Sequence, residues 1–219
     1  MTGIQNFIEY ADDFIGHGLL AATQAHDAWL IADTSSAGTP TYVRGGVGGA
    51  ATLTLDTQAE AENVCLYHGD DLNFDIDDID HIEVRVKQEQ ATIDSTSQIS
   101  FGLASARNDD IDLIAHAALF RLVGSNAIVV ETDDAVLNND DVATAEVLTS
   151  SYRKFVISFA SGVKDVRFFV DGARVAASTT FDMSNYTGAL QPLLQIQKTS
   201  DTNGDGVSID YVKIVSRRS

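Results

Sequence analysis

Apolar and polar residues alternate along much of the chain, most densely between Tyr152 and Arg217. Residues 154–160, for example, place Phe155, Ile157 and Phe159 on one face. A period of two residues is typical of a β-strand, because successive side chains point to opposite faces of a sheet. In this block the pattern predicts strands over residues 154–160, 166–170, 173–177, 190–197 and 207–215.

Turn signals separate these predicted strands. Asp171-Gly172 stands between two of them, and Asp-Gly favours a type I′ turn, in which both central residues have positive φ. We therefore predict a tight hairpin there. The loop over residues 199–206 is rich in turn-forming residues, and we predict that it joins the last two strands as a second hairpin.

The preceding part of the chain shows the same alternation. Residues 81–87 place Ile82, Val84 and Val86 on one face, as expected of a half-buried antiparallel strand, and we expect residues 98–104 to be its neighbour. Residues 133–145 read as a long acidic loop. Further strands are expected over residues 29–32, 51–55, 63–67, 117–123 and 127–131.

The domain organisation follows from length and turn spacing. The chain has 219 residues and two prolines, with no internal repeat or linker. All-β sandwiches of roughly 200–250 residues occur as one domain, with turns about every 8–12 residues. We predict a single domain over residues 1–219, in which residues 1–28 form a partly irregular N-terminal segment. A short helix over residues 19–28 is an alternative within that segment.

Charge excludes some functions. The chain carries 32 acidic and 14 basic residues, for a net charge of −18. Phosphates would repel such a protein, so we expect no direct nucleic-acid binding. No apolar run approaches the roughly 18 residues of a membrane helix, and the first residues show no secretory pattern, so we expect no membrane partner. The acidity suits either a solvated surface in a saline environment or a basic partner surface.

Two residues occur only once. Cys65 is the only cysteine, so the chain can form no intrachain disulfide and no multi-cysteine metal site. The apolar neighbours of Cys65 predict a buried thiol. Trp29 is the only tryptophan, and it can serve either as a core anchor or as a platform on which a sugar ring stacks.

Several short stretches of the sequence resemble those of a known protein family. In chain order these are Asp12-Asp13-Phe14, Trp29 to Ile31, Phe168 to Gly172 and Ile209 to Ile214. Together they resemble the concanavalin A-like lectin and glucanase jelly roll, over nearly the whole chain. The resemblance implies an all-β fold, an antiparallel two-sheet jelly-roll sandwich. Within that group, three stretches of the sequence are similar to head-decoration or fibre proteins of tailed phages. They are Asn63 to Tyr67, Phe101 to Asn108 and Val130 to Asp134.

This resemblance implies a function. The chain would be a viral structural protein that decorates and stabilises the outer capsid surface of the virion. It would bind the major capsid protein as a homo-oligomer, a trimer by analogy with other decoration proteins, and would not be an enzyme. The alternative is a carbohydrate-binding module or receptor-binding fibre domain on the same sandwich, with a glycan as partner.

One segment resembles a glucanase motif. Jelly-roll glucanases carry a Glu-x-Asp-x-x-Glu strand whose outer carboxylates act on the glycosidic bond. In the segment from Asp75 to Asp80, which also contains Asp77 and Asp78, the residues Asp75, Asp77 and Asp80 have the same spacing, with Asp at both outer positions. The shorter Asp side chains and the scarcity of tryptophan favour the alternative, a solvated acidic turn. We therefore predict no catalytic residue.

One loop resembles half of a calcium site. Asp201, Asn203 and Asp205 match the first half of the pattern D-x-[DN]-x-[DN]-G, while Val212 stands where a bidentate Glu would complete it. Two alternatives remain. Either these three residues hold calcium, or the segment is a polar loop without metal. Residues 138–141, Asn-Asn-Asp-Asp, are a weaker candidate of the same kind. We expect no other cofactor, since the histidines form no HExxH or similar motif.

Overall fold

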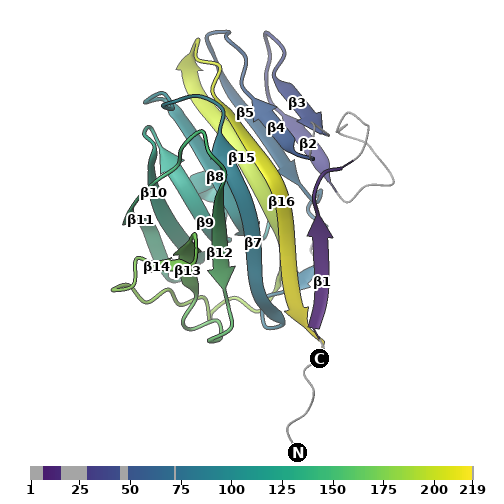
Figure 1. Cartoon of the computed structure of the whole chain (residues 1–219), viewed down its shortest axis with the longest axis vertical. Helices are drawn as coiled ribbons and strands as arrows, with labels where there is room; N and C mark the ends of the chain where they lie inside the picture. The colour runs from purple at the N-terminus through teal and green to yellow at the C-terminus, as the bar shows by residue number, and fades with distance from the viewer. Residues whose placement is uncertain (1–6, 16–28, 45–48, 72, 219) are drawn as a thin grey trace, which may run out of the picture.

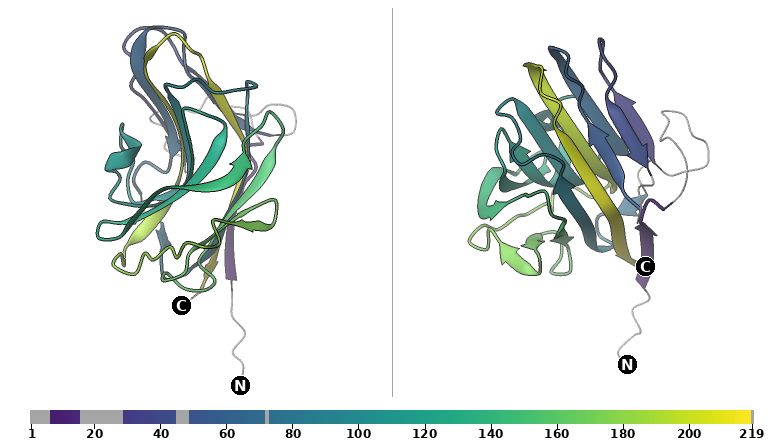
Figure 2. Two further views of the ribbon diagram at one scale, coloured as in Figure 1. Left: turned by 90° about the vertical axis from the view of Figure 1, so that its left-hand side faces the viewer. Right: turned by 45° about the horizontal axis from the view of Figure 1, so that its top comes forward.

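The computed structural model describes residues 7–15, 29–44, 49–71 and 73–218. Two antiparallel sheets of eight strands each pack face to face, as Figure 1 shows from the front and Figure 2 from the side. The predicted all-β, two-sheet antiparallel sandwich is therefore confirmed. Each sheet turns its alternating apolar residues toward the other sheet, which buries one continuous core between them.

The first sheet, called sheet A, contains the strands drawn in front in Figure 1. Its order is β14 (Ala173–Val175), β13 (Arg167–Val170), β12 (Arg153–Ser158), β7 (Ile79–Gln88), β16 (Gly206–Arg217), β4 (Ala51–Thr54) and β3 (Thr41–Arg44), while β1 (Phe7–Asp12) also pairs with β16.

The second sheet, called sheet B, lies behind it. Its order is β11 (Asn138–Val147), β10 (Ala127–Asp134), β9 (His116–Val123), β8 (Ser97–Ala104), β15 (Ala189–Asp201), β5 (Glu60–Tyr67) and β2 (Leu30–Asp33), while β6 (Phe74–Asp75) also pairs with β15. A single 3-10 turn, η1 (Ile111–Leu113), is the helical element of the described residues, and none of their helices could span a bilayer.

An aromatic cluster joins the two sheets. Phe101 and Phe120 of sheet B meet Phe155 and Phe168 of sheet A, with Phe120 lying 5.0 Å from Phe155 and 5.2 Å from Phe168 between ring centres. Edge-to-face pairs of this kind add to the stabilisation that comes from burying the rings. The core predicted from the alternation is confirmed, since these six side chains are buried: Phe155, Ile157, Phe159, Val166, Phe168 and Val170.

The predicted Asp-Gly hairpin is confirmed. Asp171 and Gly172 have φ values of +49° and +85° and connect β13 to β14. Positive φ at both central residues is the type I′ geometry, which matches the twist of the flanking strands. The Asp171 carboxylate also accepts a hydrogen bond from the Lys154 backbone amide, so it ties the turn to β12.

The second predicted hairpin is wrong. β15 and β16 follow one another in the chain, but β15 lies in the middle of sheet B and β16 in the middle of sheet A. Both strands are largely buried, so each needs neighbours on both sides within its own sheet. The loop between them therefore crosses from one sheet to the other instead of closing a hairpin.

The expected pairing of residues 81–87 with residues 98–104 is also wrong. These strands are β7 and β8, and they lie in opposite sheets; the neighbours of β7 are β12 and β16. The predicted burial is nevertheless confirmed, with Ile82, Val84 and Val86 all in the core. Alternation reveals which face of a strand is buried, but it does not reveal which strands pair.

The acidic loop expected over residues 133–145 is largely a strand. Residues 138–147 form β11, the edge strand of sheet B beside β10. Backbone hydrogen bonds to β10 hold β11 in place at the edge of the sheet. The sequence of an edge strand can therefore lack a clear alternation of apolar and polar residues. Two bulges interrupt the pairing, and Asp141 and Ala145, with positive φ, lie where the register shifts.

The two unique residues lie inside the molecule. Trp29 is buried, and its indole Nε1 donates a hydrogen bond to Asp12 Oδ2 at 3.0 Å, so the core-anchor interpretation is confirmed. Cys65 is buried as predicted, and burial raises the pKa of its thiol. Strand β1 lies within the segment expected to be partly irregular, while the possible helix at residues 19–28 falls outside the described residues.

Candidate functional site

The outer face of sheet B, which points away from sheet A, is divided into two halves. Residues 105–115, here called the covering segment, fold across one half and include η1, visible at the left of the side view in Figure 2. Ile111 and Ile114 pack there against apolar residues of the sheet, namely Cys65, Ala104, Ala117, Leu119 and Leu193. The covering segment is therefore anchored by a small hydrophobic core of its own.

The other half of this face is polar. A row of hydrogen-bonded side chains, here called the polar strip, crosses five strands: Asn63 on β5, Gln195 and Gln197 on β15, Gln98 on β8, Arg121 on β9 and Glu131 on β10.

Each member of the strip is bonded to the next. Gln197 Oε1 accepts from Asn63 at 3.3 Å and from Gln195 at 2.8 Å, and its Nε2 donates to Gln98 at 3.4 Å. Arg121 donates to Gln98 Oε1 at 3.1 Å and to the Glu131 carboxylate. Mutual bonding fixes the orientation of every amide, so the strip presents a preset pattern of donors and acceptors.

Three buried atoms of the strip have no hydrogen-bond partner. They are Asn63 Oδ1, Gln195 Oε1 and Arg121 Nε, and the three residues are each at least 97% buried. Buried polar atoms are nearly always bonded, because an unmet group costs about 1–3 kcal/mol. The strip therefore has unused hydrogen-bonding capacity, while its members Gln98 and Gln197 are half-buried and reach the surface.

Four carboxylates surround the single guanidinium of Arg121. Asp112 of the covering segment lies 2.6 Å from it, Asp141 3.4 Å and Asp140 3.7 Å, and Glu131 is in direct contact. One positive charge therefore faces four acidic groups at the edge of the strip. Oxygen atoms of Glu131, Asp140 and Asp141 lie within 4.8 Å of one another, a spacing at which they could hold a hard cation.

Burial changes the ionisation of Glu131. It raises the pKa of this carboxyl to about 7, against the attraction of Arg121 that favours the charged form. The pKa of Asp141 is also raised, by burial and by neighbouring Asp140 and Asp112 against the opposing effect of Arg121. The charge of this end of the strip therefore changes near neutral pH.

The structure places the glucanase-like aspartates elsewhere. Asp75 ends β6 in sheet B, and Asp80 is the second residue of β7 in sheet A. A tight turn connects the two strands, with the Asp78 amide bonded to Asp75 O at 3.0 Å. Asp75 and Asp77 are exposed, and Asp80 pairs with His81 and Arg217. The acidic-turn interpretation therefore describes this segment, which belongs to neither half of the outer face of sheet B.

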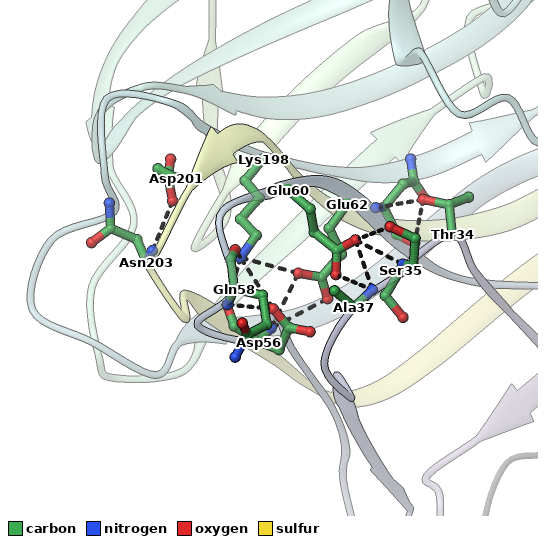
Figure 3. Close-up of polar contacts among 12 residues, drawn as sticks. Thr34, Ser35, Ala37, Asp56, Gln58, Glu60, Glu62, Lys198, Asp201 and Asn203 are labelled. Carbon is green, nitrogen blue, oxygen red and sulfur yellow. Dashed lines mark hydrogen bonds and ion pairs between the residues drawn. The ribbon is translucent and has the colours of Figure 1, made fainter.

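The calcium-like loop links β15 to β16. Asp201 Oδ1 accepts a hydrogen bond from the Asn203 amide at 2.7 Å, as Figure 3 shows, while Asp205 Oδ2 accepts from the Asp94 amide at 2.8 Å. Asp205 thus turns toward another loop. Asp201 Oδ2 is buried without a partner, so one carboxylate oxygen remains for a cation. Calcium at Asp201, Asn203 and Asp205 stays a prediction.

A buried ammonium group lies in the same region. Lys198 Nζ donates to the backbone oxygens of Asp56 and Gln58 at 2.6 and 2.9 Å and lies 3.2 Å from the Glu62 carboxylate (Figure 3). The side chains of Lys198 and Glu62 are both fully buried. Lysine therefore supplies the positive charge inside this end of the sandwich.

Sequence reasoning missed the polar strip. Its members are spread from residue 63 to residue 197, and no local motif connects them. One signal was present: glutamine and arginine occupy alternate positions of otherwise apolar strands, such as Gln195 and Gln197 in β15. Residues 138–141 were noted as a weak cation candidate, and Asp140 and Asp141 of that segment do lie beside Glu131.

Solved structures resemble this chain in fold. No protein-family model matches it, and no curated protein matches its sequence. A β-glucanase from Bacillus licheniformis superimposes with a TM-score of 0.64 at 11% identity, over 98% of this chain and 99% of the other. The carbohydrate recognition domain of Emp47p gives 0.58 at 12% identity, over 90% and 92%. The fold is a concanavalin A-like jelly roll.

A third neighbour comes from a phage. A carbohydrate esterase of the Shiga toxin-encoding bacteriophage phi24B has a TM-score of 0.51 at 14% identity, over 95% of this chain and all of the other. These neighbours confirm the resemblance to lectins and glucanases, while the decoration-protein type is not shown by them. The expectation that the chain is not an enzyme is corrected, because several neighbours are glucanases, including glycoside hydrolase family 16.

Proposed function

We propose that this protein binds carbohydrate through the polar strip on the outer face of sheet B. The observation that carries the proposal is the continuous chain of hydrogen bonds from Asn63 to Glu131. Each sugar hydroxyl both donates and accepts, and amide side chains do the same in a fixed orientation.

The comparisons favour the same chemistry. Carbohydrate recognition domains, glucanases and a carbohydrate esterase share this fold, and this supports a glycan as the ligand. Among the members of the strip, Gln98 and Gln197 are half-buried and the others are buried. A ligand would therefore meet the strip along its open edge.

The test uses the half-buried amides, whose removal leaves the buried Arg121–Glu131 pair in place. Gln98→Ala and Gln197→Ala should each weaken binding on a glycan array about tenfold or more. Gln58→Ala, which removes an exposed amide from the loop between β4 and β5, is the matched control. Release of reducing ends from bound glycans, measured in parallel, tests whether binding leads to cleavage.

Two outcomes would contradict the proposal. One is an array on which the folded wild-type chain binds no glycan. The other is binding that both strip variants retain in full, since the ligand would then lie elsewhere on the molecule. Circular dichroism of each variant verifies that the sandwich is intact.

Calcium at the loop between β15 and β16 can be tested separately. Titration with calcium chloride should show one weak site that Asp201→Asn removes, because this change takes away one of the two carboxylates of the predicted set. Asp140→Asn serves as a comparison, since it reports on the separate cluster beside Glu131. Binding lost only in Asp140→Asn would assign the cation to that cluster instead.

Attachment to a virus capsid is a second proposal for this chain. The observation that favours it is apolar surface at the rims of both sheets: Phe7 and Ile8 on β1, and Val136 and Val147 at the β10–β11 edge, are 49–72% exposed. Such residues suit contacts between subunits or with the major capsid protein of a virion. Copurification of this chain with capsids in fixed stoichiometry would support capsid attachment. A chain that does not copurify with capsids would contradict it.

A further inference from the structure

A small groove lies on the outer face of sheet A, on the opposite side of the molecule from the polar strip. It has a volume of about 290 Å³ and is lined by residues of β7, β12 and β13 and by Gly172 of the following turn. Pockets that hold small molecules start at roughly 300 Å³, so the space suits one ring-sized group.

The floor of the groove is apolar. Val156 is directly opposite Phe169 on β13 and Glu83 on β7, so the three side chains form one row across neighbouring strands. Val156 and Phe169 are only half-buried. The solvent-facing side of an antiparallel sheet normally carries polar residues, so an open aromatic ring beside an aliphatic side chain is a departure from the pattern of this face.

One wall of the groove is polar and rigid. Glu83 Oε1 accepts a hydrogen bond from Tyr211 Oη at 2.7 Å, and Glu83 Oε2 lies 3.3 Å from Lys154 Nζ. Next to it, His81 Nδ1 lies 2.9 Å from Asp80 Oδ2, which sets the ring orientation and leaves Nε2 as the nitrogen that can meet a ligand. The wall thus offers acceptors and donors whose positions are set before a ligand arrives.

The charges that line the groove are balanced. Lys154 pairs with Glu83, and Asp80 beside His81 pairs with Arg217, although the whole chain has a net charge of −18. An ionic ligand would find no unpaired counter-charge among these residues. An uncharged ligand with one apolar face and several hydroxyl groups fits both the floor and the wall.

We propose that this groove is a second binding site, which takes a single ring of a neutral sugar. The C–H face of the ring would lie on Phe169 and Val156, and its hydroxyls would bond to Glu83, Lys154 and His81. This site is separate from the polar strip, so each can exist without the other. If both are present, one chain could engage two points of a glycan surface and gain avidity.

The experiment records amide NMR spectra of the full-length, isotope-labelled chain with cellotriose, with mannotriose and with glucuronic acid as a charged probe. A neutral trisaccharide should shift the signals of Glu83, Val156 and Phe169. Phe169→Ala should weaken that binding about tenfold or more. Arg174→Gln is the matched control, because Arg174 is opposite Phe169 on β14 but does not line the groove.

Each outcome decides between the two sites. Sheet A shifts that persist in Gln98→Ala and vanish in Phe169→Ala would support the groove, whatever happens at the polar strip. The absence of sheet A shifts with both neutral trisaccharides would overturn it, as would equal weakening in Phe169→Ala and Arg174→Gln, or a response to glucuronic acid alone. Shifts confined to sheet B would overturn the groove and leave the polar strip standing.

Discussion

Individual residues of one type have different roles here according to the face on which they lie. Phe159 is 1% exposed and belongs to the core between the sheets, whereas Phe169 is half-buried on the outer face of sheet A. Removing a buried ring loses its transfer free energy and leaves a cavity. Removing a half-buried ring leaves space that water can fill.

Phe159→Ala should therefore lower the free energy of unfolding by roughly 3–5 kcal/mol. Phe169→Ala is the control, and it should cost clearly less because its ring already faces solvent. Chemical denaturation of the two variants measures the difference. Equal losses would show that Phe169 is held in the core and that the groove on sheet A is closed in solution.

Glu131 should give the protein a pH-dependent stability. Its pKa in the folded state is about 7, above the ordinary 4.5 that it regains on unfolding. The folded state therefore holds the proton more tightly, so this group stabilises the fold fully below pH 4.5, and that contribution is lost as pH rises toward 7.

Glu131→Gln should remove this fall in stability, since an amide does not titrate and Asp112 and Asp141 still lie beside Arg121. Unfolding midpoints of wild type and variant, compared from pH 4 to pH 8, measure it. Glu60→Gln is the control of opposite sign, because hydrogen bonds from Ser36 lower the pKa of Glu60. A constant difference between wild type and Glu131→Gln at every pH would contradict the prediction.

At the scale of elements, similar turn-forming residues lead to a hairpin in one place and to a crossing between the sheets in another. The β13–β14 hairpin follows from Asp171-Gly172 alone. The loop between β15 and β16 has equally strong turn residues, yet it crosses between sheets. A two-residue turn leaves the chain no alternative to pairing, whereas a longer loop permits either connection.

Gly172→Ala should destabilise the hairpin by about 1 kcal/mol, because φ of +85° is unfavourable for alanine. No atom lies within 4 Å of where its Cβ would stand, so the cost is conformational and not steric. Gly172→Asn should recover part of the loss, since asparagine tolerates positive φ. Denaturant midpoints report both changes, and equal destabilisation by alanine and asparagine would point to a steric cause instead.

The whole molecule combines high negative charge with apolar rims. A net charge of −18 opposes self-association at low ionic strength, where charges act over about 30 Å at roughly 0.01 M salt. The exposed apolar residues of β1 and of the β10–β11 edge favour association. Salt decides between these two opposing effects.

We therefore expect a homo-oligomer, proposed to be a trimer, that is more stable as salt concentration rises. A stable interface would bury on the order of 1,200–2,000 Å². Sedimentation velocity over a salt series measures the association, and Val136→Ser tests the β10–β11 edge, with Leu113→Ser on η1 as an exposed control. A monomer at every salt concentration would contradict both the trimer and its role in capsid attachment.

The sequence by itself determined which segments are strands and which of their faces are buried. Alternation is a local property, so Phe155, Ile157 and Phe159, or Ile82 and Val84, could be assigned to the core before any pairing was known. Strands β1, β3, β6 and β11 were exceptions, which the alternation did not reveal. In β11, for example, the strand is made by backbone bonds to β10 and not by its side chains.

Apart from the β13–β14 hairpin, only the tertiary structure decided which strands became neighbours, and hence which polar residues met. The polar strip unites Asn63, Gln98, Arg121, Glu131 and Gln197, which lie far apart in the chain. The groove on sheet A likewise depends on Val156 lying between Glu83 and Phe169. Such contacts depend on strand order and register, which the core of both sheets sets collectively and which no local segment encodes.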